Sequence, residues 1–343
     1  MSHSTKKFQG LNASRPFQRG LTLIELLVAL VISSVIAIAA ISALVVSRQG
    51  FTSVDAASQL RDNARFAMDM LQRFGVQAGF NDFADATTVW PKDPITGKPL
   101  DNPLANVRGF NNSRADATDP VNSATARTVA TEPGFGSDVL ILQYQVSQTF
   151  PGSNVSDRSM IDCFGSAPLV TPIGPGDRRA NVIHVGVDGT GEPGLRCSTD
   201  EVRVPRSQPL ISGVENFQVL YGVDGVTAGL EATGPLTSLA TNYLRADQLT
   251  VPADPDGSKT NSNWRRVRSL KIGMVIRGPI GSAQSAVAQT YYPLGKAIEA
   301  PGGAPGSALS SASDAGTAFS PPADTRLRQV VSFTIHLRNE QGL

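Results

Sequence analysis

The 343-residue sequence contains few of the residues on which most catalytic and metal sites depend, with two cysteines and three histidines. It has no Cys-x-x-Cys or His-Glu-x-x-His motif, no P-loop and no nucleophile elbow. Charged residues make up only 17%, the net charge is +1 and no long basic block occurs, so nothing indicates nucleic-acid binding. We therefore expect a non-enzymatic chain with no cofactor, metal site or nucleic-acid partner.

Several remaining features that could carry chemistry have plainer interpretations. His184 and His336 lie on the polar phase of alternating segments, where we expect solvated side chains. Gly189 to Gly194 matches Gly-x-Gly-x-x-Gly, but no helical pattern follows, so we interpret it as a hairpin loop. Asp254 and Asp256 stand in Asp-Pro-Asp-Gly, which is a turn signal and lacks the ligand pattern of a calcium loop.

The dominant feature is an apolar run from residue 21 to residue 46, in which Glu25 is the only charged residue. A helix over this run would be about 39 Å long, which is enough to cross a bilayer. The first 20 residues carry four basic residues and no acidic one, and losing them would change the net charge from +1 to −3. The positive-inside rule therefore predicts a cytoplasmic N-terminus and places everything after Val46 across the membrane.

Two ordinary explanations of this run remain open. A cleaved secretory signal peptide could use the small-residue site around Ala37 and Ala39, but the run is too long and contains Glu25. An uncleaved membrane anchor would tolerate an unpaired Glu25 poorly, because a carboxylate in hydrocarbon is costly and therefore usually functional.

The segment from Gly20 to Leu30 closely resembles the prepilin signature of type IV pilins and type II secretion pseudopilins. The resemblance implies that a prepilin peptidase cleaves between Gly20 and Leu21 and methylates Leu21 as the new N-terminus. Most family members have phenylalanine there, so Leu21 is a departure. The family's early glutamate is matched by Glu25, and the resemblance implies that its carboxylate pairs with the terminal amine of a neighbouring subunit and sets the register between subunits.

Beyond the membrane run, the pattern predicts an α+β fold, and the resemblance implies that this fold is pilin-like. A long helix with a membrane half, 21–46, and an amphipathic half, 47–80, would pack on an antiparallel β-sheet. Apolar residues at three- and four-residue steps define the expected buried stripe: Phe51, Val54, Ala57, Leu60, Ala64, Ala67, Met68, Leu71 and Phe74. No proline occurs from Phe17 to Trp90, and Gly75 and Gly79 are candidate stop signals.

Five alternating segments predict strands, each with one buried and one solvated face, beginning near Leu140, Ile183, Phe217, Leu270 and Val331. An aperiodic stretch at 81–134 precedes them, and turn-rich inserts at 222–263 and 278–324 separate the later ones. We expect a leader at 1–20 and one β-rich domain at 81–343. Cys163 and Cys197 lie in the exported part, where a disulfide is the default; unpaired buried thiols and a redox pair are the alternatives.

Three further segments resemble PilW-type minor pilins: residues 65–80, residues 209–224, and the C-terminal stretch from 324 to 339. This resemblance implies a non-catalytic minor pilin in the initiation and assembly of a type IV pilus and in twitching motility. It would be anchored in the inner membrane with a periplasmic domain and incorporated in the pilus. Its partners would be other minor pilins, the major pilin, the prepilin peptidase and the inner-membrane assembly platform. A type II secretion pseudopilin of the J class, and a membrane-anchored periplasmic enzyme or binding module, are the alternatives.

Overall fold

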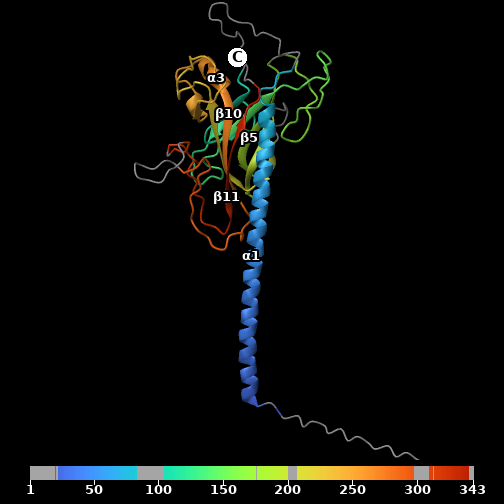
Figure 1. Ribbon diagram of the computed structural model, residues 1–343, viewed down its shortest axis with the longest axis vertical. Coiled ribbons are helices and arrows are strands. Elements are labelled where there is room, and N and C mark those ends of the chain that lie inside the picture. The colour runs from blue at the N-terminus through green and yellow to red at the C-terminus, as the bar shows by residue number, and fades with distance from the viewer. Residues whose placement is uncertain are drawn as a thin grey trace, which may run out of the picture. The chain divides into compact units, whose positions relative to one another are not determined.

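The computed structural model describes residues 20, 22–82, 104–174, 176–199, 207–296, 309–311 and 313–339. The chain divides into two compact units, Met1–Phe51 and Thr52–Leu343. The long helix α1, Leu23–Gln77, runs through both, and the second unit contains the strands (Figure 1). The structure is thus α+β, with a long N-terminal helix and antiparallel sheets, as the sequence predicts.

Two antiparallel sheets and a hairpin make up the β-structure of the second unit. The first sheet has the order β1-β4-β5-β6-β7 and the second β11-β10-β8-β9, while β2 pairs with β3 alone. The strands of the first sheet and hairpin are β1 Val107–Phe110, β2 Ser113–Ala115, β3 Ala124–Ala126, β4 Val139–Tyr144, β5 Arg179–Val187, β6 Pro193–Thr199 and β7 Gln208–Ser212. The strands of the second sheet are β8 Val214–Val223, β9 Asn242–Leu244, β10 Val267–Arg277 and β11 Arg328–His336; a short helix, α3, spans Ser258–Arg265 and the 3₁₀ turn η1 spans Asp247–Leu249.

The five strands predicted from alternation are β4, β5, β8, β10 and β11, but the sequence did not separate them into two sheets. Short strands in the inserts were also missed, because β1, β2, β3 and β9 contain only three or four residues each. The loop around Gly191 joins β5 to β6 as a hairpin, as expected. The Asp-Pro-Asp-Gly turn also forms, and it leads directly into α3.

The expectation of one solvated face per strand is correct for β11 and wrong for β4, β5, β8 and β10, in which neither face is solvated. In β11, Val331 and Ile335 are buried, whereas Ser332, Thr334 and His336 are exposed. All ten residues of β8 are buried, because β8 is central in its sheet and the first sheet approaches it. The backbone N–H of Asp138 donates to the carbonyl of Phe217 at 2.8 Å, which fixes that approach.

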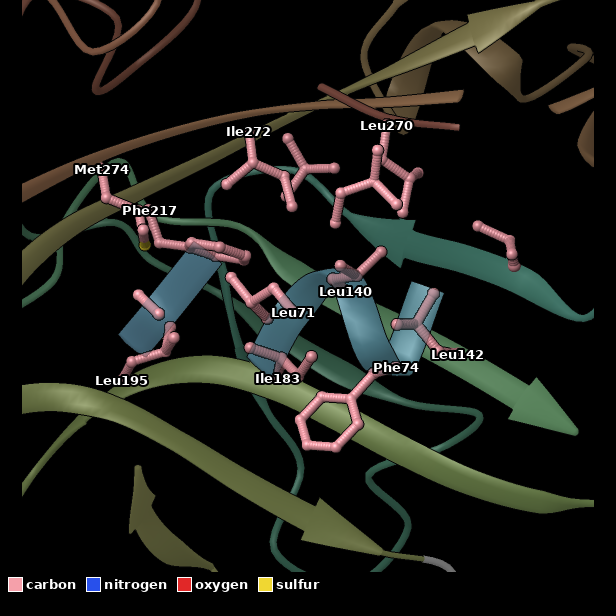
Figure 2. Packing of buried hydrophobic residues seen from close by; sticks show 14 of the residues in the cluster. Leu71, Phe74, Leu140, Leu142, Ile183, Leu195, Phe217, Leu270, Ile272 and Met274 are labelled. Atoms are coloured by element: carbon pink, nitrogen blue, oxygen red, sulfur yellow. The ribbon is translucent and has the colours of Figure 1, made fainter. Parts of the chain in front are cut away.

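The amphipathic part of α1 fills the space between the two sheets (Figure 2). Leu71 and Phe74 pack among Leu140 and Ile183 of the first sheet and Phe217 of the second. Burying one leucine or phenylalanine side chain stabilises the folded state by about 1.5–3 kcal/mol. The buried residues of α1 are Ala56, Leu60, Ala64, Ala67, Leu71, Phe74 and Gly75.

The predicted stripe is therefore correct at Leu60, Ala64, Ala67, Leu71 and Phe74, but it is wrong at Met68, which is exposed, and at its start. Phe51 and Val54 are 75% and 72% exposed, because the buried face reaches the sheets only from Ala56 onward. Gly75 does not stop the helix: a Cβ there would lie 2.6 Å from Cγ2 of Ile335, so glycine permits close packing of α1 on β11. The helix ends at Gln77, and Gly79 follows with φ of 76°, a left-handed conformation that favours glycine.

Candidate functional site

The candidate assembly site is the first turn of α1 and the apolar helix that follows it. The Thr22 N–H and the Thr22 hydroxyl both donate to Oε2 of Glu25 at 2.9 Å, and the Glu25 N–H donates to Oγ1 of Thr22 at 3.4 Å. This reciprocal pair is a capping box, which satisfies N–H groups that the first helical turn leaves open. Gly20 is exposed, and Leu21 lies outside the described residues.

The carboxylate of Glu25 is only partly satisfied by this cap. Both hydrogen bonds reach Oε2, and Oε1 has no partner within the part of the chain that the structure describes. Two hydroxyls farther along behave differently, since Ser34 donates to the Val31 carbonyl and Ser42 to the Ile38 carbonyl, each at 2.8 Å. Glu25 thus keeps an open acceptor at the very start of an apolar segment.

The residues that follow Glu25 present apolar side chains all round the helix. Every residue from Thr22 to Ser47 is exposed. Among the described residues, α1 is the one helix long and apolar enough to cross a membrane, with a mean hydropathy of 2.7 over its most apolar window. A surface of this extent must be covered by lipid or by other protein.

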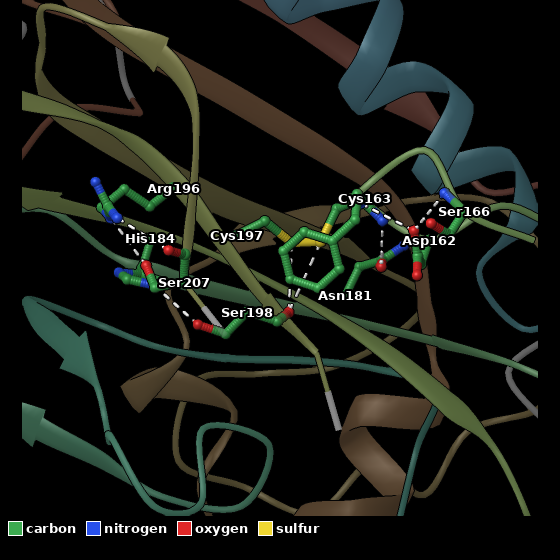
Figure 3. The surroundings of a disulfide bond; sticks show 10 residues. Asp162, Cys163, Ser166, Asn181, His184, Arg196, Cys197, Ser198 and Ser207 are labelled. Carbon is green, nitrogen blue, oxygen red and sulfur yellow. Dashed lines mark hydrogen bonds between the residues drawn. A yellow bond between two sulfur atoms is a disulfide. The ribbon is translucent and has the colours of Figure 1, made fainter. Parts of the chain in front are cut away.

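A disulfide joins Cys163 to Cys197 in the second unit, and their Cα atoms are 6.3 Å apart (Figure 3). Cys197 lies on β6, whereas Cys163 belongs to the long connection between β4 and β5. The Cys163 N–H donates to Oδ1 of Asn181 at 3.0 Å, so the same point of the connection is also tied to β5. The bridge therefore anchors a long insert to the first sheet.

The prediction that His184 is solvated is wrong, because its side chain is buried beneath neighbouring segments. His184 shares its face of β5 with Ala180 and Val182, which pack against Ala115 of β2 and Ala124 of β3, so the β2–β3 hairpin covers this side of the strand. Nε2 of His184 lies 3.3 Å from Oγ of Ser198 (Figure 3), and burial lowers the pKa of His184 to about 4. His336 is exposed, as expected.

Two acidic side chains, Asp138 and Glu192, link the two sheets. The Asp138 carboxylate accepts the N–H groups of Asn112 at 2.9 Å and Val219 at 2.8 Å, and burial raises the pKa of Asp138 well above its usual value. Glu192 in the β5–β6 hairpin accepts from Arg277 of β10 at 2.8 and 3.0 Å. Sequence reasoning missed both links, because their partners are 81 and 85 residues apart.

A second acidic anchor, Glu215, holds the ends of β10 and β11. Arg277 donates to Oε1 of Glu215 at 2.9 Å, and Arg328 reaches the same carboxylate and that of Asp324. A hollow of about 590 Å³ borders Glu215 and Arg277, but these two groups already pair with each other. In the described ranges no group of three or more His, Cys, Asp or Glu could hold a metal ion. The paired charges of Glu215, Arg277 and Arg328 hold the ends of β8, β10 and β11 together.

Two sequence families match the chain. The family described as Type IV Pilus-assembly protein W matches residues 182–339, and the prokaryotic N-terminal methylation motif matches residues 15–41. Among solved structures, the type IV-like pilin TTHA1219 from Thermus thermophilus is similar at 14% identity, with a TM-score of 0.38, covering 82% of this chain and 98% of that one. No curated protein matches.

Proposed function

We propose that this chain, a PilW-type pilin with a prepilin N-terminus, is a non-catalytic minor pilin that takes part in initiating and assembling a type IV pilus. It is held in the inner membrane through α1, with its N-terminus in the cytoplasm and its second unit in the periplasm. From there it enters the pilus together with other minor pilins and the major pilin. The prepilin peptidase and the assembly platform act on it before incorporation.

One observation supports this proposal above the others: a fully exposed apolar helix begins with a carboxylate that its own chain satisfies on one oxygen only. A buried charge in hydrocarbon costs on the order of 3 kcal/mol on membrane-insertion scales unless it is paired. Cleavage after Gly20 would create an ammonium group at Leu21, close in sequence to Glu25. The same group on a neighbouring subunit would lie at nearly the same depth in the membrane.

In this mechanism the pair of Thr22 and Glu25 caps the helix and also leaves one carboxylate oxygen for the neighbouring subunit. The capping box fixes the first helical turn and holds Oε2, while Oε1 is left to accept a hydrogen bond from the partner's Leu21 ammonium. Pairing removes the cost of burying both charges and fixes how far one helix is displaced along its neighbour. The apolar side chains supply contact area but no such register, since they carry no directional groups.

The experiment is complementation of a deletion strain with Glu25 variants, scored by surface piliation and twitching. A glutamine at position 25 keeps the cap, because its amide oxygen still accepts from Thr22, but it carries no charge. We therefore expect Glu25→Gln to fail, close to the deletion strain. A matched control in the same segment is Ser42→Ala, whose lost hydroxyl bonds only within the helix, and it should assemble normally.

Normal piliation by Glu25→Gln would refute the register role and leave Glu25 as a cap. Mass spectrometry of the mature chain tests processing separately: we expect it to begin at methylated Leu21, and a chain that begins at Met1 would contradict the proposal. Loss of exoprotein secretion, with twitching unchanged in the deletion strain, would instead favour a type II secretion pseudopilin.

A further inference from the structure

The two large sheets end in four edge strands, and three of them are poor templates for further pairing. β1 has four residues, β9 has three, and β7 carries Pro209, which lacks an N–H group. β11 is different: it has nine residues, and the stretch from Gln329 to Ile335 contains no charge and no proline. Proteins usually shorten or guard such edges, because unpaired backbone groups recruit other strands.

The outward backbone groups of β11 can be assigned from its ladder. The Leu337 N–H donates to the Arg268 carbonyl at 2.9 Å, and Leu337 directly follows the pair of Ser269 and His336. In an antiparallel ladder such bonded pairs alternate with pairs that do not exchange hydrogen bonds. Residues 329, 331, 333 and 335 therefore face β10. Residues 330, 332, 334 and 336 direct their N–H and C=O groups away from it, and no hydrogen bond within the described residues uses these groups.

Helix α1 lies beside this edge. It packs on β11 where Gly75 meets Ile335, and Arg326, just before β11, lines the same hollow as Leu60. The helix and the strand therefore run side by side in the same direction (Figure 1). Residues seven apart share a helical face, so Met68, Arg61 and Val54 continue the column of Gly75, and all three are exposed. Arg61 has no ion pair among the described residues.

We propose that the free edge of β11 accepts an extended segment of another polypeptide as an additional strand. The segment would pair with the outward groups of residues 330–336. Its inward side chains would alternate so that apolar groups reach Met68 and Val54 and a carboxylate reaches Arg61. Main-chain pairing supplies affinity and the alternate side chains supply specificity, as in other cases of strand addition. The inference concerns this edge alone and does not depend on the role of Glu25.

A second copy of this chain is a poorer occupant. Two β11 edges paired in antiparallel fashion would turn the Thr52 ends of the two copies in opposite directions. In each copy the chain before Thr52 is the apolar half of α1, and the apolar halves of the two copies would have to enter the same membrane. Two copies would also offer Arg61 no carboxylate along the paired strands, because residues 329–335 carry no charge.

The first measurement is hydrogen exchange of the full chain in detergent micelles. Amides of residues 330, 332, 334 and 336 should exchange quickly, and those of 331, 333 and 335 at least about tenfold more slowly. The probe is a blocked, fluorescent peptide, Val-Thr-Val-Thr-Glu-Thr-Val-Thr-Val, followed by anisotropy. Its binding should slow the outward amides selectively. Slow exchange of those amides in the free chain, or no binding of the peptide, would overturn the proposal.

Variants then locate the binding. Thr334→Pro removes one outward N–H and should weaken peptide binding at least tenfold, whereas the matched Thr334→Val keeps the N–H and should bind normally. If Thr334→Pro does not fold, a peptide N-methylated at alternate residues provides the same test with the unaltered chain. Arg61→Glu should favour a lysine-centred peptide over the glutamate one, and Arg73→Glu, on another face of α1, should not. Equal binding by all variants, or a dimer that Thr334→Pro dissociates, would overturn the proposal.

Discussion

A shift from pH 7 to pH 5 should destabilise the second unit through His184. The imidazole is buried on β5, and its pKa is lowered to about 4, compared with an ordinary value of 6.5. At pH 7 the ring is neutral in both the folded and the unfolded chain, so it imposes no penalty. Between pH 6.5 and pH 4 the unfolded chain binds a proton that the folded chain does not bind, and stability falls as the pH falls.

The size of this effect follows from the two pKa values. One pKa unit corresponds to about 1.4 kcal/mol, and pH 5 lies about one and a half units below the ordinary pKa of 6.5. The free energy of unfolding should therefore fall by about 2 kcal/mol between pH 7 and pH 5 because of His184 alone. The effect approaches its limit near pH 4, where the folded ring also becomes protonated.

The assay is urea unfolding of the full chain in detergent micelles at both pH values. His184→Gln removes the titrating group, so its loss of stability on acidification should be about 2 kcal/mol smaller than that of the unaltered chain. His336→Gln, at an exposed position, should keep the full pH dependence. Carboxylates titrate equally in all three proteins and cancel in the comparison. An identical pH dependence in His184→Gln and the unaltered chain would refute the argument.

Two further predictions concern the core and the bridge. Replacing Cys163 and Cys197 together by alanine opens a loop with a sequence separation of 34, and the chain-entropy estimate gives a loss of about 3–4 kcal/mol in unfolding free energy. Reducing the unaltered chain should have a similar effect, and a loss below about 1 kcal/mol would contradict the estimate. Leu71→Ala should cost about 2–5 kcal/mol, because Leu71 is fully buried between the sheets, whereas the exposed Met68→Ala should cost under about 1 kcal/mol; equal losses would contradict this packing.

The sequence predicts those parts of the fold that depend on local periodicity. The 3.6-residue pattern around Leu60 to Phe74 identifies the face of α1 that is buried, and the two-residue pattern of Val331 to Ile335 identifies a strand with one wet face. These patterns work because each side chain's environment is set mainly by its own element. The capping pair of Thr22 and Glu25 is similarly readable, since its partners are three residues apart.

What the sequence does not predict is which distant segments pack over a given face of a strand. His184 follows a polar phase, yet it is buried because the β2–β3 hairpin packs over that side of β5. The way the two sheets are joined is equally non-local, since Asp138 bonds to Val219, 81 residues away. To predict the unpaired edge of β11, one must know which strand is outermost in the sheet. Alternation of apolar and polar residues does not give the order of the strands.

The position of the α1 stripe between two sheets has a mechanical consequence for a subunit under load. A pull along the axis of α1 would act parallel to the helix surface, so contacts from Leu60 to Phe74 would have to slip together rather than open one after another. Sliding of this kind resists tension better than peeling, because many side chains share the force at once. The second unit would then fail when the helix is pulled out from between the sheets, before the sheets themselves unfold. That step sets the largest force that the second unit withstands.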